Sequence, residues 1–175
     1  MSELFSIQLQ NRQQQGRDGI WLDLPTTTEQ VQAALRQIGI SSDNPQGLSI
    51  SGYFAEEENM ELMLMGRYRL LIIKIFGELD QHKASSVREN ADRELGRTGA
   101  VNVAFNFENV TFMDSSGIGV IMGRYKTVTA LGGKVIIYGA SDAVNRLIEM
   151  SGIKSIVTVA DNLENGVKEA GIDVQ

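Results

Sequence analysis

Near its start, the chain alternates hydrophobic and polar residues in two segments, FSIQLQ (residues 5–10) and GIWLDL (residues 19–24). Such alternation predicts half-buried β-strands. Hydrophobic residues then recur at helical spacing from Val31 to Ile38, and Gly39 fits the end of this predicted helix. The segment GLSISGYF (residues 47–54) predicts a third strand. We therefore expect the order strand, strand, helix, strand in the first third of the chain.

Two details of this region lead to more specific predictions. Thr26 precedes the predicted helix and has Glu29 three positions later, which is the spacing of a capping box at a helix N-terminus. Trp21 lies inside the second predicted strand. Because large aromatic residues are buried on average, we expect Trp21 to be part of the hydrophobic core.

From residue 60 onward, strand patterns alternate with helix patterns. The segments ELMLM (residues 61–65) and LLIIKIF (residues 70–76) flank GRYR and predict a hairpin. Further strands are predicted at residues 101–107, 134–138 and 155–159, and helices around residues 84–95, 118–128, 144–148 and 162–170. Strands that alternate with helices imply a largely parallel sheet with helices packed over it. The expected fold class is therefore α/β.

Acidic residues are concentrated at the start of the chain. The 175 residues carry a formal net charge of −6 at pH 7. Residues 1–58 contain eight acidic and three basic residues, a net charge of −5, whereas residues 59–175 contain fourteen acidic and thirteen basic residues, a net charge of −1. The run AEEEN (residues 55–59) is typical of solvated segments between domains. We therefore predict two domains, residues 1–58 and residues 59–175.

The composition disfavours several classes of function. The negative net charge disfavours direct binding to nucleic-acid phosphates. The sequence has no cysteine, which excludes disulfides and thiol catalysis, and its single histidine, His82, excludes a histidine-rich metal site. It has no hydrophobic run of about 18 residues that would predict a transmembrane helix, and its N-terminus lacks the pattern of a secretory signal. We expect a cytoplasmic protein without metal, cofactor or membrane partner.

The segment TFMDSSGIGVIMGRYK (residues 111–126) is the main candidate for a functional site. A nucleophile elbow requires Gly-x-Ser-x-Gly, and neither serine of the segment has that context. A Walker loop requires Gly-Lys-Ser/Thr at its end, which the segment lacks. Gly117, Gly119 and Gly123 lie inside the helical pattern, whereas a dinucleotide-binding loop places its first glycine before the helix. We interpret these glycines as positions where the helix packs closely on the sheet.

A helix cap and a phosphate acceptor explain the same segment better. Asp114 or Ser115 is expected to cap the helix that follows. A helix start exposes unpaired N–H groups and a partial positive charge, which favour an added anion. A phosphate on Ser115 would add about −1.5 to −2 charges. It would therefore change the surface that a partner meets without unfolding the domain. No catalytic residue is predicted, so we do not expect an enzyme.

Three segments of the second region resemble the anti-sigma factor antagonists of the sporulation and stress type, which are STAS domains. They are GELDQHKA (residues 77–84), FNFENVTFMDSSGIGVIMGRYK (residues 105–126) and GGKVIIYGASDAVNRLIEMSGI (residues 132–153). The resemblance extends from about residue 60 to the C-terminus, and FMDSSG is the phosphorylation loop of that family. It implies a STAS fold, in which a mixed, mostly parallel sheet is flanked by helices.

The resemblance also implies a mechanism of partner switching in transcription regulation. Ser115 would be phosphorylated by an anti-sigma factor that is also a serine kinase. The unphosphorylated form would bind this kinase and free the sigma factor, and a PP2C-type phosphatase would reverse the modification. The partner-binding surface would include Asp80, Asp114, Ser116 and Gly117. A homodimer and a nucleotide-binding sensor stay open as alternatives.

The first region resembles a different family. The segment GIWLDLPTTTEQVQAALRQIGI (residues 19–40), followed by GLSISGYF, is similar to the N-terminal module of the ArdA antirestriction proteins, which are acidic DNA mimics. The resemblance implies a small α+β module of ββαβ order over residues 1–58. Antirestriction by DNA mimicry is therefore the alternative function, although ArdA proteins use several modules and far more negative charge. A role in protein binding or dimerisation, or an artificial fusion, would also explain this module.

Overall fold

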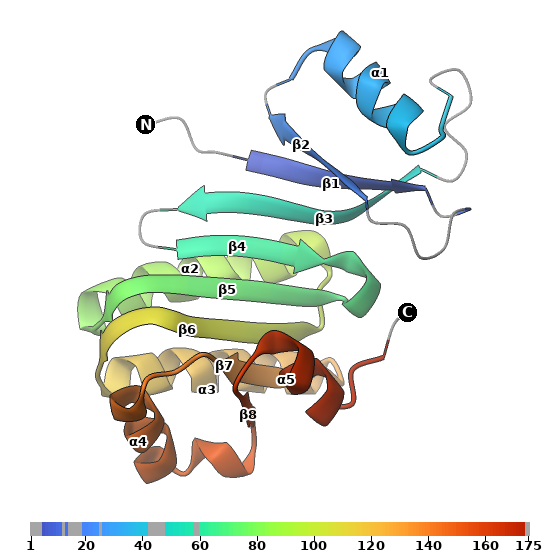
Figure 1. Ribbon diagram of the computed structural model, residues 1–175. Coiled ribbons are helices and arrows are strands. Elements are labelled where there is room, and N and C mark those ends of the chain that lie inside the picture. The colour runs from blue at the N-terminus through green and yellow to red at the C-terminus, as the bar shows by residue number, and fades with distance from the viewer. Residues whose placement is uncertain are drawn as a thin grey trace.

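The computed structural model describes residues 5–11, 13, 19–24, 26–41, 48–57 and 60–173, and their strands form one eight-stranded sheet in the order β2-β1-β3-β4-β5-β6-β7-β8 (Figure 1). The strands are β1 (Phe5–Asn11), β2 (Ile20–Leu24), β3 (Leu48–Glu57), β4 (Met60–Met65), β5 (Leu70–Leu79), β6 (Asn102–Met113), β7 (Val135–Tyr138) and β8 (Thr158–Ala160). The helices are α1 (Thr28–Gln37), α2 (Gln81–Thr98), α3 (Ser115–Ala130), α4 (Asp142–Ser151) and α5 (Leu163–Glu169), with short 3₁₀ turns η1 (Gly66–Tyr68) and η2 (Ile153–Ser155).

The sheet is antiparallel over its first strands and parallel over its last. The strands from β1 to β5 pair with their neighbours in antiparallel fashion, and β4 and β5 form the predicted hairpin. The pairs β5–β6, β6–β7 and β7–β8 are parallel, and a helix connects the two strands of each pair. This arrangement confirms the predicted α/β class, with a mixed and mostly parallel sheet after residue 60.

The helices cover the two faces of the sheet unequally. In Figure 1, α2 and α3 lie behind the sheet and α5 lies in front of it. The rear face carries the main hydrophobic cluster, to which α2, α3 and α4 all contribute. Val103, Phe105 and Phe107, which alternate along the strand predicted at residues 101–107, are all fully buried in this cluster. On the front face, Ile136 packs with Leu163 of α5 in a smaller cluster.

The first strands and α1 share a small hydrophobic cluster of their own, formed by Leu9, Ala34, Leu35, Ile38 and Ile40. The predicted capping box is present but lies one residue later than expected. Thr27, not Thr26, is the cap: its hydroxyl accepts the Gln30 N–H at 3.3 Å, and its own N–H donates to the Gln30 side-chain oxygen at 3.0 Å. The hydroxyl of Thr26 donates to the same Gln30 oxygen at 2.8 Å but is not part of the capping box.

Trp21 is not a core residue, and that prediction is wrong. Its neighbours in β2, Ile20 and Leu22, face the hydrophobic cluster beneath α1. Because side chains alternate along a strand, Trp21 points to the other face. It is 41% exposed there.

The acidic run predicted as a segment between domains is mostly part of a strand. Ala55, Glu56 and Glu57 belong to β3 and pair with Leu62, Glu61 and Met60 of β4. Residues 58 and 59 lie outside the described residues. The sheet therefore continues across the predicted boundary, and the division into residues 1–58 and 59–175 stays a prediction about folding units.

Two strands differ in extent from their predictions. The segment SIVTV was expected to be a strand throughout, but β8 begins only at Thr158, because Ser155 ends the 3₁₀ turn η2 and the next two residues complete the turn into the strand. By contrast, β6 continues beyond the predicted residue 107 as far as Met113. This extension carries the strand directly to the serine segment.

Candidate functional site

Two strand-to-helix turns lie side by side where β5 and β6 end. The strands are parallel, and Leu79 pairs in register with Met113 as the last residue of each. Each strand is followed by an aspartate, Asp80 or Asp114, and then by a helix. The Asp114 N–H donates to the Leu79 carbonyl at 3.5 Å, which joins the two turns. The structure thus brings Asp80 and the serine segment together, although they are distant in the sequence.

Ser115 is the first residue of α3, and it is exposed. The helix cap is Asp114, whose carboxylate accepts the Ser116 N–H at 2.7 Å. Of the two residues predicted as caps, Asp114 is therefore the one used. The Ser115 hydroxyl makes no hydrogen bond with any other described residue. It is consequently accessible and not committed to holding the helix.

Asp80 caps α2 in the neighbouring turn. Its carboxylate accepts the N–H groups of His82 and Lys83, each at 3.0 Å. The bond from the Lys83 N–H is the main cause that lowers the pKa of Asp80 below its usual value of 3.8. A fixed negative charge therefore lies in the turn beside Ser115. The side chain of His82 is exposed and takes no part in this geometry.

Gly117 is needed for the close approach of α3 to the strand ends. It is buried, and a Cβ atom there would lie 2.4 Å from Cγ of Met113 and 3.1 Å from Cδ2 of Leu79. A side chain would push the helix start away from the sheet. Gly117 therefore positions the serine turn from beneath, and a direct contact between it and a partner stays a prediction.

The prediction of close packing is wrong for Gly119 and Gly123. A Cβ atom at either position would meet no heavy atom within 4 Å. Gly119 is exposed and lies four residues after Ser115, so the two residues share one face of α3. On the outer face of α3, one turn after the serine, the helix backbone at Gly119 is therefore exposed and has no side chain over it.

Phe112 is a surface residue of this edge that the sequence pattern did not reveal. Phe112 is 51% exposed, although the first six residues of its strand are all buried. The cause is a pair of irregularities in the β5–β6 register, between Lys74 and Phe76 and between Gly77 and Glu78. A β-bulge adds one residue to a strand, so in the sequence it shows only as a break in the alternation of hydrophobic and polar residues. The two polar residues at 108 and 109 were the only such signal.

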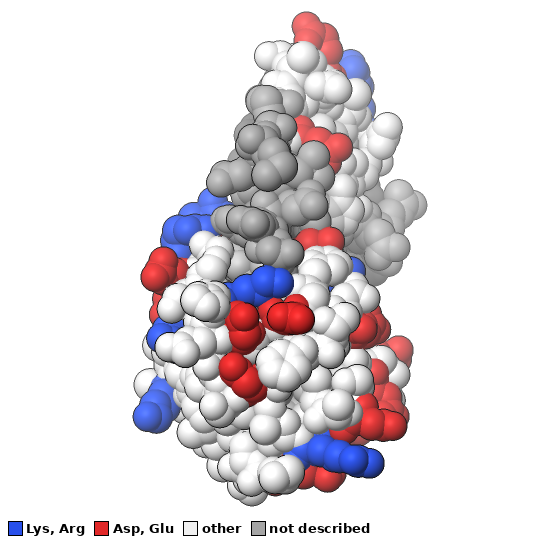
Figure 2. Space-filling model, turned by 90° about the vertical axis from the view of Figure 1, so that its left-hand side faces the viewer, with Lys and Arg blue, Asp and Glu red and all other residues white. Residues whose placement is uncertain are grey.

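Acidic side chains gather around the two turns. Glu78 at the end of β5 and Glu108 in β6 are exposed, and Asp80 and Asp114 are partly exposed. Figure 2 looks onto this side of the molecule, and acidic side chains occupy the middle and the right-hand side of its lower half. The site is therefore a helix start with an accessible hydroxyl and several carboxylates around it. Lys83 lies among them, and its Nζ would be 3.4 Å from a Cβ atom at Gly77.

The arginine of the serine segment serves the fold rather than this surface. Arg124 is 4% exposed, and its guanidinium contacts the Asp92 carboxylate at 2.9 Å and the Arg88 carbonyl at 3.3 Å. Burial lowers the pKa of Arg124, and the negative charge of Asp92 partly counters this effect. Arg124 therefore joins α3 to α2 beneath the site.

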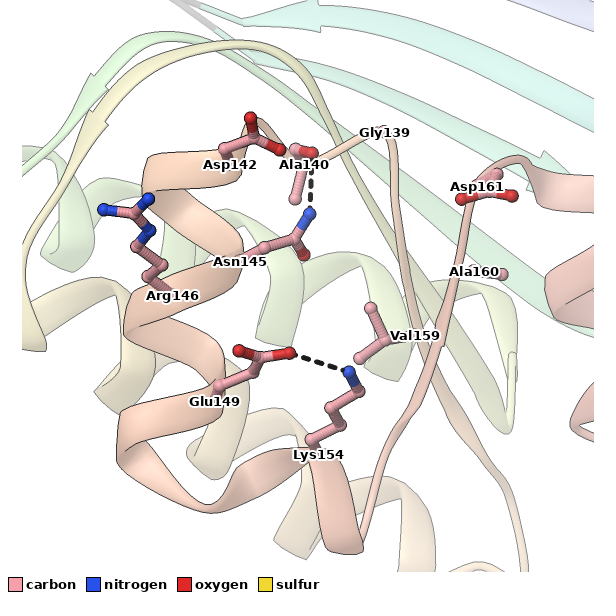
Figure 3. A pocket seen from close by; sticks show the side chains of 10 residues that line it. All are labelled: Gly139, Ala140, Asp142, Asn145, Arg146, Glu149, Lys154, Val159, Ala160 and Asp161. Atoms are coloured by element: carbon pink, nitrogen blue, oxygen red, sulfur yellow. Dashed lines mark hydrogen bonds and ion pairs between the residues drawn. The ribbon is translucent and has the colours of Figure 1, made fainter.

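A separate hollow of about 580 Å³ lies between α4 and the ends of β7 and β8 (Figure 3). Lys154 is paired with Glu149 at 2.9 Å, and the Asn145 side chain donates to the Ala140 carbonyl at 2.9 Å. In Figure 3, Arg146 points away from β8. Because its basic groups do not converge, this hollow is not part of the candidate site. The described residues also contain no cluster of three or more metal-ligating side chains and no helix that could cross a membrane.

Known proteins similar to this chain share both the sequence and the fold of its second region. An anti-sigma F factor antagonist of Paenibacillus polymyxa is 35% identical over 111 residues, which cover 63% of this chain and 95% of that protein. An anti-sigma-B factor antagonist of Staphylococcus aureus (strain NCTC 8325 / PS 47) is 32% identical over 92 residues, covering 53% and 84%.

Solved structures give the same result. The anti-sigma factor antagonist SpoIIAA in its unphosphorylated form matches with a TM-score of 0.56 and 29% identity, covering 65% of this chain and 97% of that one. The Bacillus cell fate determinant SpoIIAA in the phosphorylated form matches with a TM-score of 0.51 and 27% identity, covering 63% and 97%.

The family match lies entirely within the second region of the chain, and no part of the first region is included in it. The STAS domain profile matches residues 61–170. The resemblance of residues 1–58 to ArdA therefore stays a prediction. The matched range contains both strand-to-helix turns, Ser115 and the five-stranded part of the sheet. The chain belongs to the STAS domain family.

Proposed function

We propose that this protein is an anti-sigma factor antagonist that is switched by phosphorylation of Ser115. The unphosphorylated form binds an anti-sigma factor that is also a serine kinase, and this binding frees the sigma factor. Phosphorylation by the bound kinase ends the interaction, and a PP2C-type phosphatase restores it. The role is regulatory rather than catalytic and belongs to the cytoplasm, where transcription takes place. The similar proteins named as anti-sigma factor antagonists support this proposal.

The exposed hydroxyl of Ser115 is the observation that carries the proposal. A serine that capped its own helix would have to give up that bond to react with a kinase. Here Asp114 supplies the cap, so the Ser115 hydroxyl can be modified while the helix start keeps its hydrogen bond. Ser116 is less suitable, because it is only partly exposed and its N–H is held by Asp114.

The charge of the added phosphate explains the switch. At a helix start, a phosphate with about −1.5 to −2 charges is tolerated by the free N–H groups. The surrounding surface already carries Glu78, Asp80 and Asp114, so the phosphate adds negative charge beside three carboxylates. A partner matched to the unmodified surface would then meet excess charge. Like charge placed across an interface costs several kcal/mol, or roughly 10²-fold or more in affinity.

The experiment is phosphorylation by the cognate anti-sigma kinase and ATP, followed by mass spectrometry. We expect a mass increase of one phosphate on Ser115 and none on the Ser115→Ala protein, with Ser116→Ala as the matched control that is still modified. By calorimetry, Ser115→Ala should keep its affinity for the kinase and Ser115→Asp should lose roughly 10²-fold. Equal phosphorylation of Ser115→Ala, or unchanged affinity of Ser115→Asp, would contradict the proposal.

A further inference from the structure

We infer that Phe112 is the hydrophobic anchor by which the kinase partner docks beside Ser115, and that the same partner covers the bare backbone of α3 at Gly119. This inference rests on the proposed function, because it takes the anti-sigma kinase as the occupant of the surface. It adds the residues that make the contact and the chemistry of the partner face.

The position of Phe112 is produced by the two bulges in β6. After the first bulge, Val110 points into the main core. A regular strand continuing from Val110 would direct Phe112 to the same face, since side chains alternate with a period of two. The second bulge, between the pairs Gly77–Val110 and Glu78–Phe112, puts Met113 into the core instead. The strand is therefore shaped so that its last phenylalanine faces solvent.

Phe112 is close enough to Ser115 to be covered by any protein that phosphorylates it. Only Met113 and Asp114 separate the two residues, and all belong to one edge of the sheet. Single exposed hydrophobic residues are common and by themselves indicate nothing. An aromatic ring beside a residue that must enter a kinase active site lies near the centre of the interface, where such side chains supply most of the binding energy.

Gly119 of α3 is the second residue that we assign to the docking surface. Glycine in a helix interior is less stable than alanine, so it is usually kept where backbone must be approached closely. Among the described residues nothing approaches it, since a Cβ atom there meets no heavy atom within 4 Å; this is equally true of Gly96 and Gly123, and Gly119 differs from them in lying close to Ser115. Gly119 lies one turn after Ser115 on the same face, so a partner that covers Ser115 can lie against the helix backbone.

The charges around Phe112 describe the partner face. Glu78 pairs directly with Phe112 across the strands, and Asp80 and Asp114 follow at the two turns. An apolar pocket with a basic side chain at its rim would match a ring that has the exposed Glu78 as its strand neighbour. The kinase is therefore expected to present such a pocket next to its active site.

The test measures the affinity of the full chain for the cognate anti-sigma kinase by calorimetry. Phe112→Ala should raise Kd by about 30-fold, which corresponds to a typical interface hot spot. The control Leu131→Ala removes a side chain that is 59% exposed at the other end of α3, and it should change Kd less than about 2-fold. Phe112→Leu keeps an apolar side chain and should lie between Phe112→Ala and the wild type.

A glycine pair separates binding from folding. Gly119→Ala in α3 and Gly96→Ala in α2 both add a methyl group in open space, so both should raise the melting temperature. Only Gly119→Ala should weaken kinase binding, by about 10-fold, as expected for a methyl group that keeps two packed surfaces apart. Its loss of affinity cannot come from unfolding.

The outcomes also separate this inference from the proposed function. If the wild-type chain neither binds the kinase nor is phosphorylated, the proposed function fails. If the wild type binds and Ser115 is modified, but Phe112→Ala and Gly119→Ala bind with unchanged Kd, only the docking surface is overturned. If Phe112→Ala lowers the melting temperature, its Kd is not used, and an unchanged Kd of Gly119→Ala overturns the docking surface.

Discussion

The turn after β5 and the turn after β6 have the same construction but different chemistry. Both follow parallel strands that end in register, both use an aspartate as helix cap, and both start helices that pack on the same face of the sheet. The first residue of the helix is Gln81 in one turn and Ser115 in the other. The fold thus provides two similar helix starts, and only one of them carries a hydroxyl that a kinase can modify.

The two caps also differ in how many N–H groups they occupy. Asp80 accepts two, from His82 and Lys83, whereas Asp114 accepts only that of Ser116. Fewer side-chain bonds leave more of the positive end of α3 available to an added anion. The second difference is the exposed residue before each turn. Leu79 and Met113, the last residues of the two strands, are both buried, but an exposed aromatic residue, Phe112, precedes only the serine turn. Under the proposed function, recognition by the kinase depends on the surroundings of the hydroxyl as well as on its place in a helix.

Moving the serine from one turn to the other should have the largest effect. In a Ser115→Ala, Gln81→Ser protein, the new serine occupies the same place in α2 that Ser115 has in α3. We expect its phosphorylation by the cognate kinase to be about 10²-fold slower or more, because misplacement by an ångström or more has effects of that size. The rate is measured by mass spectrometry over time. A rate near that of the wild type would mean that any serine at this edge suffices.

Removal of the cap of α3 should have an intermediate effect. Asp114→Ala should lower the free energy of unfolding by about 1 kcal/mol, because the Ser116 N–H loses its acceptor. Asp114→Asn keeps an oxygen that can accept the Ser116 N–H, so its free energy of unfolding should fall much less. Urea denaturation of both proteins measures the difference. Equal stability of Asp114→Ala and the wild type would show that α3 is held by packing alone.

The smallest effect is a pH dependence that belongs to the α2 turn. The pKa of Asp80 is lowered in the folded protein, so its contribution is present above the unfolded pKa and is lost as the pH falls through the folded pKa. Asp80→Ser keeps a capping oxygen that does not titrate. The stability of the wild type should therefore fall towards that of Asp80→Ser as the pH is lowered from 7 to 2 in denaturation experiments. A difference that stays constant over this range would contradict the assignment.

The sequence predicted the elements well where a pattern reflects local physics. The serine helix was expected from its apolar spacing and its cap from Asp114 or Ser115, and both agree with α3. The predictions were wrong where several adjacent residues could act as the helix cap, or where burial depended on a segment distant in the sequence. Thr27 caps α1 because three threonines stand in a row, and Trp21 is exposed because no described helix covers its face of β2. Glu56 and Glu57 form strand because β4 offers a partner.

By itself, the sequence determined that an α/β sheet forms after residue 60 and that a serine begins a capped helix, because hydrophobic period and cap chemistry act over a few neighbouring residues. Only the tertiary structure decided that Asp80 lies beside that serine, that Phe112 turns outward and that Gly119 faces open space. These facts depend on the register of β5 against β6 and on which surfaces remain uncovered. Register and coverage are set by contacts between segments far apart in the chain, and no local pattern contains them.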